Sequence, residues 1–339
     1  MTKWTWYVVL SLLGAGCSGE AVARALLIDG NAAITAPRFA EGDIDGDGRS
    51  ELVAGGRVGR FRAVTDPFAA KTARVEVYAG NSLIADARAA SENLHVVNDV
   101  AVGDVDGDGR AEIVAIGDYR VYVLEYGVSG LKVSYMSALA DGRFLRVAVG
   151  DVDGDGRAEI AIAESRPESG GESPVADIRV FGFSGRFEAL ALWPLEQSVG
   201  DLCFGDFDGD GQVDMAVEQG GEEVGGQIGL FGFDGVQPYE RFTREVTEEQ
   251  VRVLNLSARR LGDVDVLGVG DVRGLVQLMR LDGSNFSVFD QVELPRDSGF
   301  VHGLHLTQLF GEKGLQVICG TAPAGAAFGR LWLIDRMGY

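Results

Sequence analysis

Acidic residues and glycines alternate in a short stretch that this chain contains twice. The eleven residues GDVDGDGRAEI occupy 103–113 and again 150–160. Each copy crowds three aspartates and a glutamate into nine residues of a chain whose formal net charge is already −21. Like charges at this spacing repel each other strongly wherever water is partly excluded. We therefore expect a cation to compensate them.

The first copy has the residue types of a calcium cage. Its carboxylates belong to Asp104, Asp106, Asp108 and Glu112. Glycines at the fourth and sixth loop positions let the backbone curl until the three aspartates converge, and the carbonyl of Arg110 then closes the cage with Glu112. Hard oxygen ligands in this number favour Ca²⁺ over Mg²⁺, and transition metals usually require His or Cys. A helix-loop-helix calcium loop would need glutamate at position twelve, where this copy has Ala115.

The acidic loop is one part of a longer internal repeat. Clear copies begin at Gly42, Gly103, Gly150 and Gly205. Two fainter copies keep only the run that follows the loop, at 265–271 and 316–320. The anchor positions are then Glu51, Glu112, Glu159, Asp214, Asp265 and Gln316. This spacing indicates six units of about fifty residues each.

Each unit has the pattern of four short strands separated by turns, which is typical of a propeller blade. One blade cannot bury both faces of its sheet, whereas a ring of blades can. The last unit lacks an outer strand, and an orphan strand at 24–29 precedes the first unit, so we expect that strand to close the ring. We predict an all-β fold with a single domain at 24–339, a β-propeller of six four-stranded blades. Seven blades are the alternative.

The acidic loops resemble those of FG-GAP (VCBS) repeats in the integrin α-subunit propeller and its bacterial relatives, where D-x-D-G-D-G-x-x-[DE] bridges two strands of a blade. The resemblance covers the chain from about residue 24 to its end and implies about four Ca²⁺ ions, each between the first and second strands of a blade. The ligands that it implies are Asp43, Asp45, Asp47, Arg49 (carbonyl) and Glu51; Asp104, Asp106, Asp108, Arg110 (carbonyl) and Glu112; Asp151, Asp153, Asp155, Arg157 (carbonyl) and Glu159; and Asp206, Asp208, Asp210, Gln212 (carbonyl) and Asp214.

The fifth and sixth units depart from this motif. Their first three ligand slots fall on Ser257, Arg259 and Leu261, and on Gln308, Phe310 and Glu312. Neither set suits calcium, and a guanidinium in a ligand slot would repel it. Because two units do without the motif, we interpret the ions as structural staples rather than catalysts.

The N-terminal residues predict export. Residues 1–17 combine Lys3 with an apolar run and end at Cys17, as in a bacterial lipoprotein signal in which the cysteine is lipidated. Cleavage within 21–25 and simple secretion are the alternative. We therefore expect a cell envelope lipoprotein that touches the membrane only through an N-terminal lipid. The remaining cysteines, Cys203 and Cys319, lie in apolar strand-like runs and are predicted to be buried free thiols.

The composition argues against two classes of function. Asp and Glu outnumber Lys and Arg by 51 to 30, whereas a nucleic-acid partner requires a basic surface. The three histidines are His95, His302 and His305, and the last two are expected to point to opposite faces of one strand. The chain contains no HExxH or GxSxG motif, and we therefore predict a protein that is not an enzyme.

Long loops on the face opposite the acidic loops are the predicted binding surface. The insertion at 55–74 sets positive charge beside aromatic rings, at Arg57, Arg60, Phe61, Arg62, Phe68, Lys71 and Arg74. Such anchors favour an envelope or extracellular protein or glycan as the partner. A solvated loop, or one that pairs with the acidic loops at 164–177 and 218–227, is the alternative.

Together these features predict a monomeric recognition, adhesion or scaffold module. Two further functions stay open: a glycan-binding lectin and a polysaccharide-processing enzyme.

Overall fold

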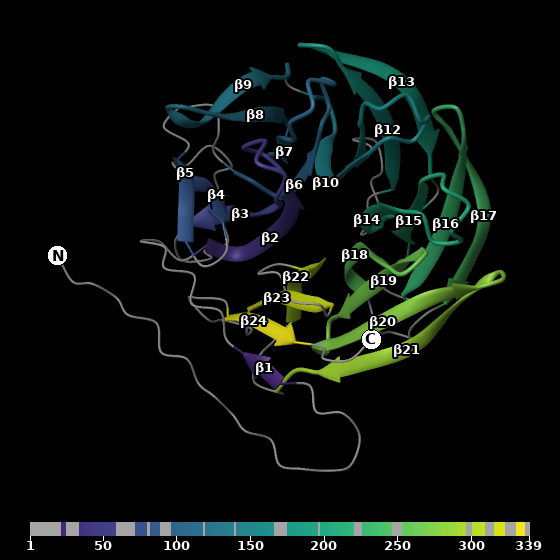
Figure 1. The fold of residues 1–339 in the computed structure, drawn as a ribbon. Coiled ribbons are helices and arrows are strands. Elements are labelled where there is room, and N and C mark those ends of the chain that lie inside the picture. Colours follow the sequence, from purple (N-terminus) through teal and green to yellow (C-terminus); the bar gives the residue numbers. More distant parts are fainter. Residues whose placement is uncertain are drawn as a thin grey trace.

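The computed structural model shows a ring of β-sheets (Figure 1). It describes residues 22–24, 34–58, 72–79, 82–88, 96–117, 119–138, 140–165, 175–195, 197–219, 226–245, 253–295, 300–308, 315–322 and 330–335. The described residues form strands and turns without any helix, and hence no helix among them is long and apolar enough to cross a membrane. The predicted signal at 1–17, with Cys17, lies outside the described residues.

Six antiparallel sheets of four strands each form the blades. Blade one contains β2 (Ile34–Gly42), β3 (Glu51–Val58), β4 (Thr72–Ala79) and β5 (Ser82–Arg88). Blade two contains β6 (Asp99–Gly103), β7 (Glu112–Ile116), β8 (Val121–Gly127) and β9 (Gly130–Met136). Blade three contains β10 (Arg143–Gly150), β11 (Glu159–Ser165), β12 (Ala176–Phe183) and β13 (Phe187–Pro194).

The second half of the ring repeats this order. Blade four contains β14 (Val199–Gly205), β15 (Asp214–Gln219), β16 (Gln227–Asp234) and β17 (Gln237–Glu245). Blade five contains β18 (Val253–Leu261), β19 (Val264–Asp271), β20 (Leu275–Asp282) and β21 (Asn285–Glu293). Blade six contains β22 (Phe300–Thr307), β23 (Gln316–Ala322), β24 (Arg330–Asp335) and β1 (Val22–Arg24). The prediction of six four-stranded blades is therefore confirmed.

The first strand of each blade lies at the axis of the ring. β2 contacts β6, and the contacts continue through β10, β14, β18 and β22 and return to β2. Figure 1 shows these strands around the centre and the fourth strands at the rim. This arrangement gives each sheet two neighbouring sheets against which to bury its faces.

The N-terminal strand closes the ring, as predicted, although it lies earlier in the sequence than expected. β1 pairs antiparallel with β24, and Ala23 lies opposite Ile334. The predicted strand at 24–29 shares only Arg24 with the observed one, and residues 25–33 lie outside the described residues. Blade six is thus built from both parts of the chain, which ties its outer edge to the N-terminal segment.

The core lies between neighbouring blades. In β7 every residue is buried, and Val114 and Ile116 of this strand cluster with Ile160 and Ile162 of β11 in the next blade. Burial of such side chains contributes roughly 1.5 to 3 kcal/mol each. The apolar runs that follow each acidic loop therefore hold neighbouring blades together.

A glycine precedes each acidic loop because the next blade packs against that position. A Cβ atom added at Gly42, Gly103 or Gly150 would lie closer than 3.0 Å to Val102, Val149 or Phe204 of the following blade. Real Cβ atoms do not occupy such positions without a shift of the neighbouring atoms. The glycine of each GD pair thus permits a close contact between blades.

We expect Gly103→Ala to destabilise the ring, because the added methyl would overlap Val149 of blade three. Overpacking of this kind costs about 1 to 3 kcal/mol, which urea unfolding of the full chain would measure. Gly127→Ala is the matched control, because no atom lies within 4 Å of its added Cβ. Equal unfolding midpoints for the two variants would contradict this account of the contact.

Candidate metal centres

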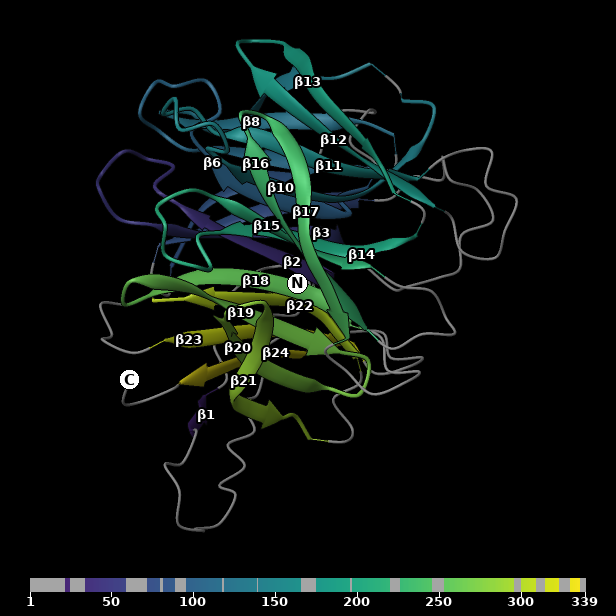
Figure 2. The same cartoon turned by 90° about the vertical axis from the view of Figure 1, so that its right-hand side faces the viewer.

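The four acidic motifs form the hairpin loops between the first and second strands of blades one to four. They connect β2 to β3, β6 to β7, β10 to β11 and β14 to β15. Neighbouring loops touch, because Ala111 N donates to Asp43 O at 3.0 Å and Ala158 N donates to Asp104 O at 2.8 Å. Figure 2 shows these hairpins along one edge of the ring. The loops of blades one to three are therefore joined to one another by hydrogen bonds.

The first aspartate of each motif curls its own loop. One carboxylate oxygen of Asp104 accepts hydrogen bonds from Gly107 N at 2.7 Å and Asp108 N at 3.1 Å, and the other accepts from Gly109 N at 2.8 Å. Gly107 and Gly109 have φ angles of 78° and 91°, which only glycine adopts readily. A tight turn around the carboxylate of the first aspartate thus requires the alternation of aspartate and glycine.

The later carboxylates of the motif are held in the same way. Asp106 accepts from Asp108 N at 3.0 Å, and Asp108 accepts from Arg110 N at 2.9 Å. Glu112, at the start of β7, reaches back to accept from Val105 N at 3.1 Å. Equivalent bonds recur in the loops of blades one and three.

This curling brings carboxylates together in all four loops. In each loop at least three acidic residues offer oxygen atoms that lie within 4.8 Å of one another. The groups are Asp43, Asp45 and Glu51; Asp104, Asp106 and Asp108; Asp151, Asp153 and Glu159; and Asp206, Asp208 and Asp210. A cluster of hard oxygen donors fits a divalent cation such as Ca²⁺. The remaining predicted ligands, which include the carbonyls of Arg49, Arg110, Arg157 and Gln212, stay predictions.

The glutamates that end the loops of blades one to three have raised pKa values. Burial, together with repulsion from the neighbouring aspartates, raises the pKa of Glu51 to about 6. The same causes raise the pKa of Glu112 and of Glu159 to about 7. The backbone bonds from Ile44, Val105 and Val152 oppose these shifts and do not cancel them. The loops therefore favour any added positive charge, a proton included.

The loop of blade four differs from the other three. Its last acidic residue is Asp214, which is one methylene shorter than glutamate and pairs with Arg241 of β17 at 2.8 Å. Arg241 also binds Asp208 at 2.6 Å, and Arg260 of β18 binds Asp206 at 2.9 Å. The Arg241 contact lowers the pKa of Asp208, whereas burial raises the pKa of Asp214 to about 6 despite that contact. The second carboxylate oxygen of Asp214 is buried and has no hydrogen-bond partner among the described residues.

The fifth unit lacks the loop altogether, which corrects the slots predicted for it. Ser257 and Arg259 lie within β18, and Leu261 ends that strand before a tight turn at Gly262 and Asp263. Asp265 occupies the strand position that corresponds to the glutamates of blades one to three. It lies opposite Arg260, as Glu51 lies opposite Gly42. Blade five thus has a short turn in the place of an acidic loop.

In the sixth unit Gln308 follows β22 and is exposed. The other predicted slots, Phe310 and Glu312, lie outside the described residues.

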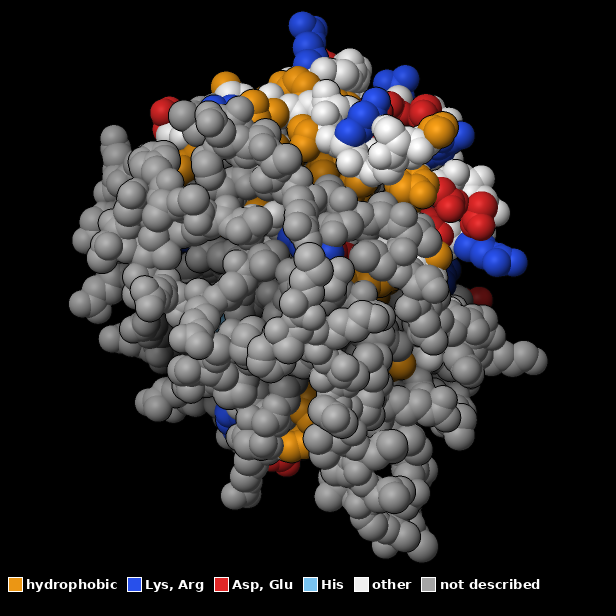
Figure 3. Space-filling view, turned by 90° about the vertical axis from the view of Figure 1, so that its left-hand side faces the viewer, with side chains coloured by type: hydrophobic (Ala, Val, Ile, Leu, Met, Phe, Trp, Pro, Cys, Tyr) orange, Lys and Arg blue, Asp and Glu red, His pale blue; other side chains and the backbone are white. Residues whose placement is uncertain are grey.

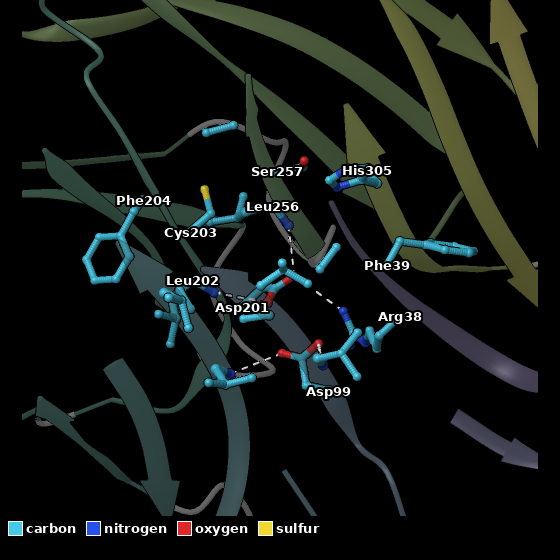
Figure 4. Close-up of a pocket in the computed structure, with 18 of the residues that line it drawn as sticks. Arg38, Phe39, Asp99, Asp201, Leu202, Cys203, Phe204, Leu256, Ser257 and His305 are labelled. Carbon is cyan, nitrogen blue, oxygen red and sulfur yellow. Dashed lines mark hydrogen bonds and ion pairs between the residues drawn. The ribbon is translucent and has the colours of Figure 1, made fainter. Parts of the chain in front are cut away.

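Charged residues at the ring axis form a cluster that the acidic motifs do not predict. Arg38, Asp99, Arg146 and Asp201 each lie thirteen positions before the acidic anchor of their own blade. Arg38 lies 3.3 Å from Asp201 and also donates to Asn255, and Arg146 Nε lies 3.4 Å from Asp201. Figure 4 shows Arg38 directed toward Asp201 across this centre. The repeat spacing was the available signal for this cluster.

The two axial aspartates also link blades. Asp99 of blade two accepts from Val147 N of blade three at 3.1 Å, and Asp201 of blade four accepts from Leu256 N of blade five at 2.9 Å. Burial raises the pKa of Asp99 to about 6, which the nearby arginines oppose. A cavity of about 160 Å³ lies beside this cluster. The cluster therefore joins first strands that would otherwise present unpaired backbone amides.

The predicted ligand face lies mostly outside the described residues. Arg57 belongs to β3, while Arg60, Phe61, Arg62, Phe68 and Lys71 fall in 59–71. Arg74 does not belong to an exposed basic island, which corrects its prediction. It lies in β4, is 1% exposed and pairs with Glu76 at 2.5 Å, because strand alternation places the two on one face.

Other described side chains refine the remaining predictions. Cys203 and Cys319 are free thiols as predicted, and Cys319 is buried whereas Cys203 is half-buried. His305 contacts Glu41 at 3.3 Å, and His95 lies outside the described residues. Val133 of β9 and Leu192 of β13 are exposed. Figure 3 shows hydrophobic side chains mixed with charged ones over the upper part of that view.

The ring and its acidic hairpins define a six-bladed β-propeller in which four blades carry an acidic loop between their first and second strands. A family model described as FG-GAP-like repeat matches residues 98–162, which span the loops of blades two and three. The match identifies FG-GAP-like repeats in blades two and three, and the same acidic hairpin recurs in blades one and four of the six-bladed propeller. None of the curated proteins matches the chain.

Solved structures share the fold at low sequence identity. A protein of unknown function from Dyadobacter fermentans DSM 18053 aligns with a TM-score of 0.60 and 11% identity, over 92% of this chain and 96% of that chain. BBS1N, solved in complex with ARL6DN and soaked with mercury, aligns with a TM-score of 0.53 and 12% identity, over 94% of this chain and 98% of that chain. At these identities the likeness establishes the architecture alone.

The acidic loops predict an unusual pH dependence for the metal-free protein. The folded pKa of Glu112 and of Glu159, about 7, exceeds the ordinary value of 4.5. The metal-free folded state therefore binds more protons than the unfolded state between these values, so its stability falls as pH rises from 4.5 to 7. Melting temperatures in EDTA across this range would measure the slope.

The double variant Glu112→Gln with Glu159→Gln is the control, because it removes the two groups that titrate. We expect its melting temperature to fall less steeply over the same pH range. Identical slopes for the variant and the natural chain would contradict this assignment.

Proposed function

We propose that this chain is a calcium-stapled, non-catalytic propeller that serves as a recognition, adhesion or scaffold module outside the cytoplasm. The observation that carries the calcium proposal is the shared geometry of the loops in blades one to three. In each, the backbone already holds the carboxylates around one point. A cation there would remove repulsion without rearranging the loop.

The ions would act as staples because the loops also join neighbouring blades. Asp43 and Asp104 are predicted ligands whose carbonyls accept hydrogen bonds from Ala111 and Ala158 of the next blade. Rigidity gained in one loop would therefore pass to the following blade. Extracellular calcium modules commonly bind at 10⁻⁴ to 10⁻³ M. FG-GAP repeats are typically extracellular or exported, which agrees with filling of such sites after export.

Recognition rather than catalysis is the function that this scaffold supports best. The FG-GAP propeller fold suggests a non-enzymatic adhesion or scaffold module. BBS1N, which shares the architecture, was solved in complex with the protein ARL6DN. For this chain we propose an envelope protein or glycan as the partner, held by Arg57, Arg60, Phe61, Arg62, Phe68 and Lys71 on the face opposite the acidic loops.

Calcium should raise the melting temperature of the full chain after chelation with EDTA. A ligand present at a hundred times its Kd stabilises the native state by about 2.7 kcal/mol per site. Asp104→Asn should reduce this gain, since it weakens the loop of blade two. Asp141→Asn, at an exposed site outside the loops, should leave it unchanged. A melting temperature that does not respond to calcium would disprove the staple.

The proposed partner face can be tested by affinity capture from envelope extract. The triple variant Arg57→Ser, Arg60→Ser and Arg62→Ser should lose the captured partner while its calcium-dependent melting stays that of the natural chain. Arg143→Ser, at an exposed site on β10, is the control that should retain the partner. Undiminished capture by the triple variant would place recognition elsewhere on the molecule.

A further inference from the structure

The acidic loop of blade four is surrounded by positive charge that the chain itself supplies. Arg241 pairs with Asp208 and Asp214, and Arg260 pairs with Asp206. We propose that these two arginines lock the loop of blade four without metal, so that it takes calcium much more weakly than the loops of blades one to three. The arginines would then be the residues that decide which loops depend on calcium.

The position of Arg241 is set by a bulge in the outer strand of blade four. The register between β16 and β17 shifts at Leu230 and Phe231, and this leaves Arg241 as the unpaired residue of the ladder. A bulge redirects its extra side chain, here toward the loop end of the blade. The same bulge slot holds Ser134 in blade two, Leu190 in blade three and Phe289 in blade five.

Arg260 reaches the loop from the neighbouring blade. It occupies the register position that is glycine before the loops of the first four blades, at Gly42, Gly103, Gly150 and Gly205. Blade five has a short turn instead of an acidic loop. Its Asp265 therefore accepts a hydrogen bond from the loop of blade four, from Asp206 N at 2.6 Å. Blade five, which lacks an acidic loop, thus contacts the loop of blade four through both Arg260 and Asp265.

These ion pairs oppose calcium because they use the carboxylates that it would need. Asp206 and Asp214 are largely buried, with side chains 12% and 7% exposed. Charge-assisted hydrogen bonds to arginine are roughly twice as strong as neutral ones, and calcium would have to displace three of them. In blade two the corresponding glutamate, Glu112, instead accepts from Val105 N. The side chain of Arg157 packs beside Gly107 of this loop, but among the described residues no arginine or lysine forms an ion pair with its carboxylates.

Hydrogen exchange measured by mass spectrometry resolves the four loops separately, in the full chain with EDTA or with calcium chloride. This test rests on the proposed calcium binding for its first arm. We expect calcium to slow exchange at 43–51, 104–112 and 151–159 and to leave 206–214 unchanged at the same concentration. The variant Arg241→Gln with Arg260→Gln should make 206–214 respond, with half-saturation shifted by about tenfold or more.

Arg244→Gln is the matched control, because Arg244 lies on the same strand and its guanidinium stacks on Phe242 rather than entering the loop. It should reproduce the natural pattern. Each single variant keeps one arginine and guards against misfolding of the double variant. Calcium protection of 206–214 in the natural chain, at the half-saturation of the other loops, would overturn the lock.

The EDTA arm separates failure of the lock from failure of the calcium proposal. If no loop responds to calcium, the calcium proposal falls. The lock still requires that Arg241→Gln with Arg260→Gln speed exchange at 206–214 in EDTA and leave 104–112 unchanged. Unchanged exchange at 206–214 in that variant would overturn the lock.

Discussion

The hydrogen bonds from backbone amides to the first aspartate of each acidic loop are the constraint on which the rest depends. Asp104 illustrates it: three amides bind its carboxylate, and the loop closes around that residue. Closure brings further carboxylates within a few ångströms, so the turn that orders the hairpin also creates its repulsion. Positive charge relieves this repulsion, and in blade four two arginines of the chain supply it.

In the ring, an acidic loop of one blade also contacts the next blade. A side chain of the next blade packs against the glycine before the loop. A backbone amide of the next blade donates a hydrogen bond to a carbonyl in the loop. At the axis, Asp99 and Asp201 repeat this connection between first strands. A change in the charge of one loop therefore acts on an interface rather than on a surface turn. This coupling explains why an acidic motif can matter for stability although it lies at the edge of the fold.

The repeat period was enough to predict the blades, because the motif marks the same hairpin each time. It also predicted closure by the N-terminal strand, whose observed bounds are Val22–Arg24 rather than 24–29. The prediction that Arg74 belongs to an exposed basic surface was wrong. Its place next to an insertion suggested exposure, whereas in β4 its side chain pairs with Glu76. Arg241 lies 27 and 33 residues from the two aspartates that it binds, and Arg260 lies 54 residues from Asp206, so local patterns could not connect them. The charged residues of the axial cluster are isolated within apolar stretches of the sequence. Only their common distance of thirteen positions from the acidic anchor of each blade relates them to one another.

A crystal structure of the full chain grown with calcium chloride tests the central claim most directly. The account predicts a calcium ion in each loop of blades one to three, coordinated by six to eight oxygens at about 2.3 to 2.6 Å. It predicts the guanidinium groups of Arg241 and Arg260 in the loop of blade four. Loops of blades one to three that hold no ion at millimolar calcium would contradict it.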